Sequence, residues 1–363
     1  MNILVTGAKG FIGLNLCLWL KNAEHNVFEY DKDSKETDLI DFINEADFIV
    51  HLAGINRPLT KEEFYDGNLY FTKKLVDLVK SSGRSIPIIF SSSAQVELDN
   101  DYGKSKKMAE DYLLSSGLKT YIYRFSNVFG WKCRPHYNSF VSTLCNAIAN
   151  DELYSIDDKE KNMHLVYIDD ICVEFVRLIN GLKTIPANSI INFESQDITL
   201  GNLESLLIAF KSSPFSFPIN PSSLVSKLYY TFISYLPNSI HPLIVHSDER
   251  GSFTELLRDQ KQGQISVNIS KPSITKGNHY HEHKVEQYLI IVGICRIELQ
   301  NTKTKEYRKI IVSGNHPTII TISPEWTHNI TNIGDTDSVT LMWCNEYFDK
   351  ENPDTYFEEV EKK

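Results

Sequence analysis

The spacing of apolar residues changes about two-thirds of the way along the chain, and this change constrains the fold more than any other feature. Up to about residue 211, short apolar runs alternate with longer amphipathic segments. Beyond about residue 247, apolar and polar residues alternate with a period of two. The first pattern is typical of parallel strands joined by helices and the second of antiparallel sheets, so we expect two domains of different class.

The first part predicts a doubly wound α/β fold. We expect buried strands at residues 3–6, 27–30, 48–52, 86–91 and 120–124, and helices at 11–21, 61–80 and 104–114. Continuous apolar runs of this kind indicate strands that are covered on both faces. Their alternation with helices therefore predicts a Rossmann-like parallel sheet.

The second part predicts an all-β sandwich or barrel of the jelly-roll type. Strand-like stretches joined by short turns cover residues 264–270, 287–292, 294–299, 307–312, 318–322 and 339–343. Loop formers are frequent at 212–223, and Pro237 and Pro242 follow an apolar helix candidate. We place the boundary so that residues 1–242 form the first domain and residues 243–363 the second.

Composition excludes several classes of partner. The formal net charge of −10 makes a nucleic-acid backbone an unfavourable partner. The six cysteines include no C-x-x-C pair, which fits free thiols in a reducing compartment. The start of the sequence lacks the basic region and cleavage site of a signal peptide, and no window is apolar for long enough to span a membrane. We therefore expect a cytoplasmic protein with no nucleic-acid or membrane partner.

A glycine-rich turn follows the first predicted strand and precedes the first helix. Residues 6–13 read TGAKGFIG, so Gly7, Gly10 and Gly13 allow a tight turn whose backbone amides, with those of Phe11 and Ile12, can approach a pyrophosphate. The helix N-terminus adds partial positive charge there. A turn without a ligand is the alternative, but the strand–turn–helix context favours nucleotide binding.

Asp31 ends the second predicted strand, where a carboxylate can accept hydrogen bonds from the adenosine ribose. Such a contact repels a 2′-phosphate and favours NADH, although neighbouring Lys32 can offset this effect. The alternative role for Asp31 is a turn or helix cap. The choice between NADH and NADPH stays open on these residues.

Tyr102 and Lys106 are four residues apart at the start of a predicted helix, so they share one helical face. Lys106 is expected to lower the pKa of the Tyr102 hydroxyl and to bind the nicotinamide ribose. Tyr102 then exchanges a proton with a carbonyl or alcohol while hydride moves at the cofactor. Ser91, Ser92 and Ser93 close the preceding strand and can supply a hydroxyl. The alternative is an ordinary start of a surface helix.

With these motifs in this order, the first part resembles the extended short-chain dehydrogenase/reductase family, which acts on nucleotide sugars. Further matches are HLAG at 51–54, Asn68, RFSNVFG at 124–130 and VYIDDI at 166–171. The resemblance implies that Ser93, Tyr102 and Lys106 are catalytic, that Leu52, Ala53 and Gly54 contact the cofactor, and that Asn127 contacts the substrate phosphate. Few residues separate Ser93 from Tyr102, which leaves open whether Ser92 or Ser93 faces the substrate.

A histidine cluster marks the second part. His279 and His281 are two residues apart on a predicted strand, so both side chains point to one side of the barrel. Glu286 and His328 on other strands can complete a set of three nitrogens and one carboxylate, which suits Zn²⁺ or another divalent transition metal. The pattern resembles the metal motif of bicupins. The alternative is a group of polar residues in a barrel mouth.

Two segments of the second part also resemble the dTDP-sugar 3,5-epimerase family. They are DERGSFTE at 248–255 and KGNHY at 276–280. This resemblance implies that Arg250, Glu255 and Lys276 contact substrate and that His279 acts as a base without metal. His279 therefore has two candidate roles, ligand and base, and the presence of Glu286 and His328 favours a metal.

The whole chain resembles the CapF family of bifunctional capsular-polysaccharide enzymes, with further matches at 267–272, 335–337 and 353–357. The resemblance implies an enzyme that acts on a UDP-linked 4-keto-6-deoxy-N-acetylhexosamine. Since cupins and nucleotide-sugar reductases often pair, we also expect a homodimer. The cupin would epimerise C3, and the reductase would reduce C4 with NADPH. The product would be UDP-N-acetyl-6-deoxy-L-talosamine, a precursor of N-acetyl-L-fucosamine in capsule or O-antigen. The alternative is a simple NAD(P)H-dependent ketoreductase with a structural metal-binding dimerisation cupin.

Overall fold

The computed structural model describes residues 1–212, 220, 222–237, 242–259 and 263–361, which form two compact units. The first unit comprises Met1–Ser212 and Ser222–Pro237, and the second includes the described residues from Pro242 onward. The predicted domain boundary after residue 242 lies beside residues 238–241, which are outside the described residues. That boundary stays a prediction.

A parallel six-stranded sheet is the centre of the first unit, and it confirms the predicted Rossmann-like fold. The strand order is β2-β1-β3-β4-β5-β8. The strands are β1 (Asn2–Thr6), β2 (Asn26–Tyr30), β3 (Phe48–His51), β4 (Ile88–Ser93), β5 (Thr120–Phe125) and β8 (Ser189–Asn192). Since β2 and β3 lie on opposite sides of β1, the sheet has its topological switch point between β1 and β3, where ligands bind in such folds.

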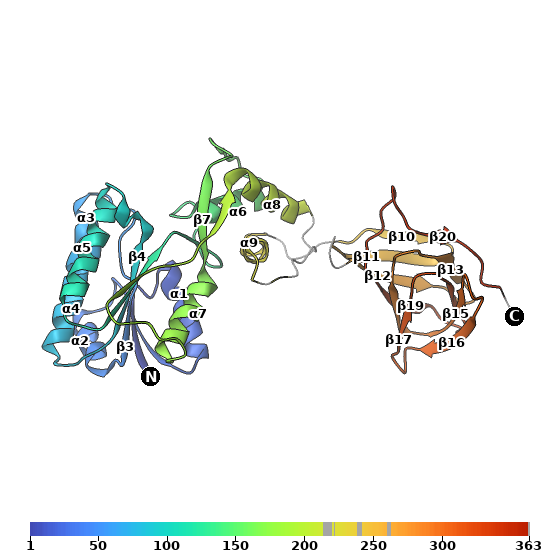
Figure 1. Ribbon diagram of the computed structural model, residues 1–363, viewed down its shortest axis with the longest axis horizontal. Helices are drawn as coiled ribbons and strands as arrows, with labels where there is room; N and C mark the ends of the chain where they lie inside the picture. Colours follow the sequence, from blue (N-terminus) through green and yellow to red (C-terminus); the bar gives the residue numbers. More distant parts are fainter. Residues whose placement is uncertain (213–219, 221, 238–241, 260–262, 362–363) are drawn as a thin grey trace. The chain divides into compact units, whose positions relative to one another are not determined.

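Helices cover both faces of this sheet, which explains why its strands are apolar throughout (Figure 1). Ile3 and Val5 pack against α1 (Phe11–Asn22) and α7 (Ile168–Ile179). Leu4 points the other way and packs against a second group of helices. That group is α2 (Glu36–Glu45), α4 (Phe71–Ser81) and α5 (Asp101–Ser115).

The predicted helix at 61–80 is a continuous helical run that changes its winding midway. It consists of α3 (Glu62–Tyr65), a π-helical turn η1 (Asp66–Tyr70) and α4. π-Helical turns inside α-helices are frequent at functional sites. Here the turn contains Asn68, which is fully buried. A short 3₁₀ turn, η2 (Ala94–Glu97), joins β4 to α5.

A smaller subregion of the first unit has its own apolar core. A three-stranded sheet of β6 (Asn127–Phe129), β7 (Asn162–Tyr167) and β9 (Gln196–Thr199) belongs to it. Three helices complete it: α6 (Phe140–Ala149), α8 (Leu200–Ser212) and α9 (Leu224–Ile233). Phe129, Leu144, Leu207 and Phe232 are among the residues that form this core.

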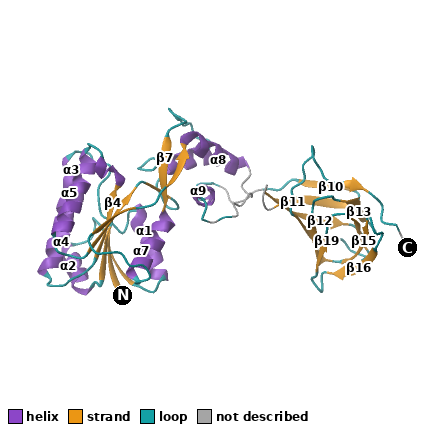
Figure 2. Cartoon of the chain, viewed as in Figure 1, coloured by secondary structure: helices purple, strands orange, loops and turns teal. Residues whose placement is uncertain are grey.

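The second unit is all-β, as predicted, with two antiparallel sheets among its described residues (Figure 2). One sheet has the order β10-β11-β12-β19-β14-β17 and the other the order β16-β15-β18-β13-β20. The strands are β10 (Val245–Asp248), β11 (Gly251–Asp259), β12 (Gly263–Ser270), β13 (Thr275–Tyr280), β14 (Glu286–Val292), β15 (Ile294–Asn301), β16 (Tyr307–Ser313), β17 (Ile319–Ile322), β18 (Trp326–Asn332), β19 (Ser338–Cys344) and β20 (Tyr356–Phe357). Of these, β10, β11 and β20 were not predicted, and β13 and β18 were expected only as the strands that contain His279 and His328.

The interior of the second unit is apolar on one side and polar on the other. Ile297, Ile330 and Tyr288 belong to its apolar core. On β12 the pattern is inverted, because the buried residues are polar and the intervening isoleucine and valine residues are only half-buried. The buried polar residues of β12 are Gln264, Ser266, Asn268 and Ser270. This side of the barrel is therefore suited to a polar ligand.

Among the described residues, no helix combines the length and apolarity that a membrane crossing requires.

Candidate active site and metal centre

The glycine-rich turn connects β1 to α1 through close backbone contacts. Gly7 has a φ of +72°, and its N–H donates to the Tyr30 carbonyl over 2.8 Å. A Cβ on Gly7 would lie 2.7 Å from the Ala53 nitrogen, and one on Gly13 only 2.2 Å from the Gly7 carbonyl. Around Gly10 the nearest atom to a Cβ is 3.1 Å away. Gly7 and Gly13 are thus required by packing, and Gly10 lies in the more open part of the turn.

Asp31 fastens this turn to the end of β2. Its Oδ2 accepts from the Lys9 N–H and its Oδ1 from the Lys32 N–H, both over 2.8 Å. These bonds match the capping role that the sequence left as an alternative. Each carboxylate oxygen has a second lone pair, so Asp31 retains the capacity to accept from a ribose hydroxyl.

Tyr102, in the first turn of α5, lies beside Ser93 at the end of β4, and the Ser93 hydroxyl acts on the Tyr102 pKa as a hydrogen-bond partner. The Ser93 Oγ also accepts from the Gln95 N–H over 3.2 Å, which fixes the hydroxyl at the start of η2. Burial raises the pKa of Tyr102, and the bond to Ser93 lowers it.

Lys106 is buried on the same face of α5, one turn after Tyr102. Its Nζ donates to the Ser91 carbonyl over 2.9 Å and lies 4.8 Å from the centre of the Phe90 ring. Burial lowers the pKa of Lys106 to about 8, against the opposing charge of Glu110. A Cβ on Gly54 would lie 3.0 Å from Nζ, so the ammonium adjoins the loop after β3 that was predicted to contact the cofactor.

The structure distinguishes the roles of Ser92 and Ser93, which lie on opposite faces of β4. The Ser92 hydroxyl donates to Oε1 of the fully buried Glu110 over 2.6 Å. Arg124 donates to both carboxylate oxygens of Glu110, over 2.9 and 2.7 Å. Ser93, rather than Ser92, therefore faces Tyr102. The sequence offered no signal for Glu110, an acidic residue on an ordinary helix.

Asn68 connects the cofactor loop to the catalytic helix. Its Oδ1 accepts from the Ile55 N–H over 2.9 Å, and its Nδ2 donates to the Ile55 carbonyl and to the Ser105 Oγ. Ile55 follows the segment Leu52–Ala53–Gly54, and Ser105 precedes Lys106. The buried Asn68 side chain thus fixes the position of the cofactor loop relative to the catalytic helix.

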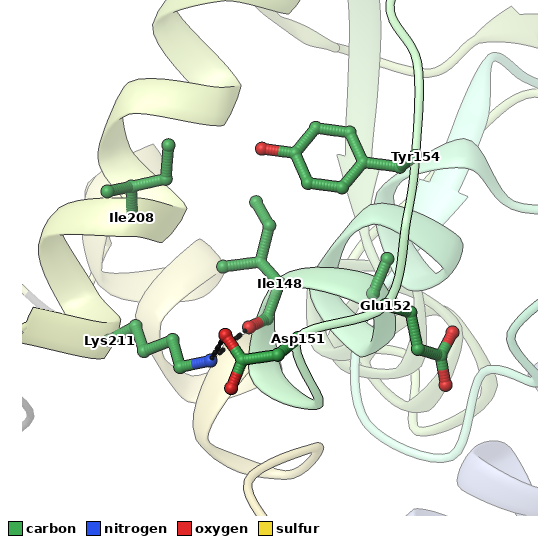
Figure 3. A pocket seen from close by; sticks show the side chains of 7 residues that line it. Ile148, Asp151, Glu152, Tyr154, Ile208 and Lys211 are labelled. Atoms are coloured by element: carbon green, nitrogen blue, oxygen red, sulfur yellow. Dashed lines mark hydrogen bonds and ion pairs between the residues drawn. The ribbon is translucent and has the colours of Figure 1, made fainter.

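Asn127, the predicted substrate contact, lies on β6 in the smaller subregion. Its side chain is exposed, and Nδ2 donates to the His164 carbonyl of neighbouring β7 over 3.2 Å. The same subregion has a surface hollow of about 300 Å³ between α6 and α8 (Figure 3). Lys211 at its rim donates to the Ile148 carbonyl and pairs with Asp151. None of the predicted site residues lines this hollow, so we assign it no role.

The four predicted metal ligands converge in the second unit. One ligand atom from each of His279, His281, Glu286 and His328 lies within 4.8 Å of all the others. The Glu286 Oε2 is 3.0 Å from the His328 Nε2 and 3.5 Å from the His281 Nε2. Residues from β13, β14 and β18 and the loop after β13 thus surround one point.

The protonation of two of these histidines fits a metal. Nδ1 of His281 is hydrogen-bonded to the Asp354 carbonyl, and Nδ1 of His328 to the Trp326 carbonyl. A carbonyl only accepts, so both Nδ1 atoms carry a proton, and in the neutral imidazole this leaves a lone pair on each Nε2. These Nε2 atoms are buried and have no partner with hydrogen-bond geometry among the described residues. Buried lone pairs aimed at one carboxylate are what a divalent transition metal requires.

The pKa shifts of His279 and Glu286 favour the forms that bind a metal, a neutral imidazole and a carboxylate. Burial lowers the pKa of His279 to about 4, and the nearby His328 adds to the effect. Burial raises the pKa of Glu286, but His281 and His328 outweigh it and hold that pKa well below its usual value. Tyr288, which the sequence analysis did not select, donates to the Glu286 Oε2 over 2.9 Å. Tyr288 lies two positions after Glu286 on β14. This spacing places both side chains on one face of a strand, and it is the sequence signal that could have identified Tyr288.

Lys276 faces the same interior as the histidines because β13 contains a bulge. The register with β18 shifts between Gly277 and His279, and Gly277 and Asn278 both have positive φ, +102° and +57°. Lys276 donates to Oδ1 of the buried Asn268 over 2.7 Å. Its pKa is lowered by burial. The predicted substrate contact is thus brought onto the side of the metal ligands.

The other two predicted substrate contacts lie on β11 and the turn before it. Arg250 is exposed and binds Asp248 through Nε and a terminal nitrogen, over 2.9 and 2.6 Å. The charge of Asp248 raises the pKa of Lys276, against the lowering by burial and by the charge of Arg250. Glu255 is half-buried, at the position where the β11–β12 register shifts.

Two family models match the chain and divide it as the fold does. Residues 3–193 match the NAD dependent epimerase/dehydratase family. Residues 246–356 match the polysaccharide biosynthesis C-terminal domain.

Full-length relatives have both parts. A protein of Pseudomonas aeruginosa described as UDP-2-acetamido-2,6-beta-L-arabino-hexul-4-ose reductase is 40% identical over 365 residues, which covers 98% of each chain. The crystal structure of the capsular polysaccharide assembling protein CapF of Staphylococcus aureus is 42% identical, with a TM-score of 0.88 over 99% of this chain and 100% of that chain. A UDP-glucose 4-epimerase of Thermotoga maritima, 20% identical with a TM-score of 0.54 over 65% of this chain and 98% of that chain, shares the fold of the first unit. The chain therefore belongs to the NAD dependent epimerase/dehydratase family, and within it to the CapF-type proteins that join this domain to a polysaccharide biosynthesis C-terminal domain.

Proposed function

We propose that the protein is a bifunctional UDP-sugar enzyme of capsular polysaccharide synthesis. Its second unit epimerises C3 of a UDP-linked 4-keto-6-deoxy-N-acetylhexosamine, and its first unit reduces the C4 ketone. The product is UDP-N-acetyl-6-deoxy-L-talosamine, a precursor of N-acetyl-L-fucosamine. The observation that carries this proposal is the presence in one chain of Tyr102 beside Ser93 and Lys106, and of a cluster of three histidines and Glu286.

The names of the relatives support the substrate. The Pseudomonas aeruginosa relative is named as the reductase of a UDP-linked 2-acetamido-2,6-hexul-4-ose, a nucleotide sugar with a ketone at C4. The Staphylococcus aureus relative is named for capsular polysaccharide assembly. Several solved structures of the same fold contain NAD, which supports a nicotinamide cofactor. We propose NADPH, with Lys9 and Lys32 flanking Asp31 as candidate partners of a 2′-phosphate.

Both reactions follow from the residues that are placed together. When bound, a nicotinamide cofactor supplies hydride to C4, and a divalent metal supplies a Lewis acid in the barrel. In the first unit Tyr102 delivers its proton to the C4 oxygen, and Ser93 orients the Tyr102 hydroxyl. The ammonium of Lys106, held beside Gly54, stabilises the negative charge that the transfer leaves on Tyr102.

In the second unit the C–H bond at C3 is acidic because it adjoins the ketone. His281, Glu286 and His328 are placed to hold the metal. His279 is either a fourth ligand or the base that takes the C3 proton. The negative charge that develops on the ketone oxygen is stabilised by a cation in the site, and Lys276 contributes positive charge to the same interior.

We also propose that the protein is a homodimer. Val267, Leu341, Leu289 and Ile319 are paired in register across four strands, and they form one apolar row on the outside of the six-stranded sheet. Ile319 is 60% exposed. A second copy is the proposed partner, because an apolar row can pair with itself about a two-fold axis with no charge left unpaired.

The two reactions are separated by proton NMR of the purified protein with the UDP-4-keto-6-deoxy-N-acetylhexosamine in D₂O. Without cofactor, we expect deuterium to enter C3, and His328→Ala is expected to abolish this exchange. On addition of NADPH, we expect reduction at C4. Reduction without exchange would instead support the alternative, a simple ketoreductase with a structural metal-binding cupin.

A further inference from the structure

Residues 353–358 lie against the part of the second unit that contains the proposed metal centre, although about 70 positions separate the two in sequence. The loop between β13 and β14 begins with His281 and ends before Glu286, so both of these proposed ligands depend on its conformation. The sequence PDTYF at 353–357 was noted only as a match to the family. None of its residues belongs to the ligand set.

The carboxylate of Asp354 binds the backbone of this loop at three consecutive positions. Its Oδ1 accepts from the Glu282 N–H over 2.9 Å, and its Oδ2 accepts from the N–H groups of His283 and Lys284 over 3.0 and 3.1 Å. Asp354 is only 9% exposed. Three hydrogen bonds from adjacent N–H groups to one buried carboxylate fix the path of the loop, because charge-assisted bonds of this kind are stronger than neutral ones.

The backbone carbonyl of the same residue accepts the Nδ1 proton of His281. This contact fixes both the tautomer and the orientation of the ring, so that the buried Nε2 lone pair is directed at the cluster. Asp354 thus acts on the loop through its side chain and on the ligand itself through its main chain. Its φ of +40° is compatible with this double contact and is tolerated by aspartate.

Neighbouring contacts hold Asp354 in place. Lys284 is buried, and its Nζ donates to the Pro353 carbonyl. Tyr356 and Phe357 form β20, which pairs with Tyr280 and His279 of β13, and the Tyr356 ring stacks on Tyr280 at 5.2 Å. The segment is therefore joined to the ligand strand on one side and to the ligand loop on the other.

We propose that Asp354 is a positioning residue of the metal centre, which sets the affinity for the metal by fixing His281 and the loop that leads to Glu286. This inference rests on the metal role proposed for the cluster. It goes beyond that role because it names residues 353–358 as the segment that holds the ligands in position. Outer partners of metal-ligating histidines are commonly worth about 10–100-fold in metal affinity.

The test measures Zn²⁺ affinity of the full chain by competition with a chromophoric chelator, after the metal has been removed. Asp354→Ala is expected to bind Zn²⁺ about 10–100-fold more weakly than the unchanged protein, and Asp354→Asn to fall between them. Asp349→Ala is the matched control, because within the described part of the chain the Asp349 carboxylate accepts only the local N–H of Glu351, over 3.0 Å. Equal affinities of the unchanged protein and Asp354→Ala would overturn the inference.

A second measurement covers the case in which Asp354→Ala fails to fold. Amide hydrogen exchange of residues 282–284 is followed in the metal-free protein, and Asp354→Asn is expected to speed it about tenfold, the effect of weakening one such bond. Unchanged protection would overturn the inference. Failure of the unchanged protein to bind Zn²⁺ at all would instead remove the metal role in the proposed function, so the two failures are distinguishable.

Discussion

Lys276 and His279 face the same interior of the barrel although they are three positions apart on β13. Their partners on β18 are Ile330 and His328, two residues apart on one face of that strand. The bulge at Gly277 and Asn278 makes this possible, since an unbroken strand would turn the two side chains to opposite faces. A proposed substrate contact and a proposed ligand thereby belong to one site.

Gly277→Ala is expected to destabilise the second unit by about 1–3 kcal/mol, because a side chain is strained at positive φ. A Cβ there would also lie 2.8 Å from the His328 carbonyl. Gly334→Ala is the matched control, because the nearest atom to its Cβ is 3.4 Å away. Denaturant unfolding of the two variants checks this, and equal losses would contradict it.

Tyr102→Phe is expected to lower NADPH oxidation by about 10²–10⁴-fold, since the proton donor to C4 is removed. Deuterium incorporation at C3 is expected to continue at the rate of the unchanged protein. Stopped-flow absorbance and NMR in D₂O measure the two activities separately. Loss of both together would refute two separable sites.

Ser92→Ala and Ser93→Ala form a matched pair on adjacent positions. Ser93→Ala is expected to reduce turnover while the melting temperature changes little, because Ser93 contacts Tyr102. Ser92→Ala removes a partner of buried Glu110 and is expected to lower stability by about 1–3 kcal/mol. Steady-state kinetics measure the turnover of each variant, and calorimetry measures its stability. A loss of turnover in Ser92→Ala and a loss of stability in Ser93→Ala would exchange the roles of the two serines.

The stability of the first unit is expected to fall in acid because of His51. This residue is fully buried between the hydroxyls of Thr6 and Thr72, and burial lowers its pKa to about 3. Its pKa is about 6.5 in the unfolded chain, so only the unfolded state takes up a proton as the pH falls from 6.5 towards 3. Lowering the pH from 7 to 5 therefore costs about 2 kcal/mol from this residue. Unfolding curves of His51→Gln should lack this share of the pH dependence, and an identical slope would contradict it.

Leu341→Glu is expected to convert the proposed homodimer to a monomer, because it places a charge in the middle of the apolar row. Ile311→Glu is the control, since Ile311 is 61% exposed on β16 in the other sheet. Sedimentation of both full-length variants measures the result. A dimer that persists in Leu341→Glu places the interface elsewhere.

The sequence predicted those features that depend on local periodicity. His279 and His281 were assigned to one face because strands have a period of two, and the glycine turn was found because glycine spacing reports close backbone packing. Long-range partners could not be predicted in this way. Asp354 lies 73 positions from His281, and nothing in the spacing of either residue refers to the other.

Adjacent residues with the same chemistry were also beyond prediction. Ser92 and Ser93 are identical in sequence terms, and their roles separate only because Glu110 and Arg124 occupy one face of β4. The hydrogen-bond partner of Lys106 was also beyond prediction, although its place one helical turn after Tyr102 was predicted. The helical spacing brings the two residues to one face, but the Ser91 carbonyl takes the ammonium hydrogen bond.

The inverted pattern of β12 has a consequence for how this group of proteins can diversify. Ser266, Asn268 and Ser270 line the interior without belonging to the apolar cluster that stabilises the barrel. Asn268 and Ser270 are hydrogen-bonded to each other, so Ser266 is the position where an exchange for another small polar residue leaves both the apolar cluster and these bonds intact while it alters the lining of the interior. The lining of the barrel and its apolar core are therefore set by different residues, so the first can change at this position while the second keeps the scaffold.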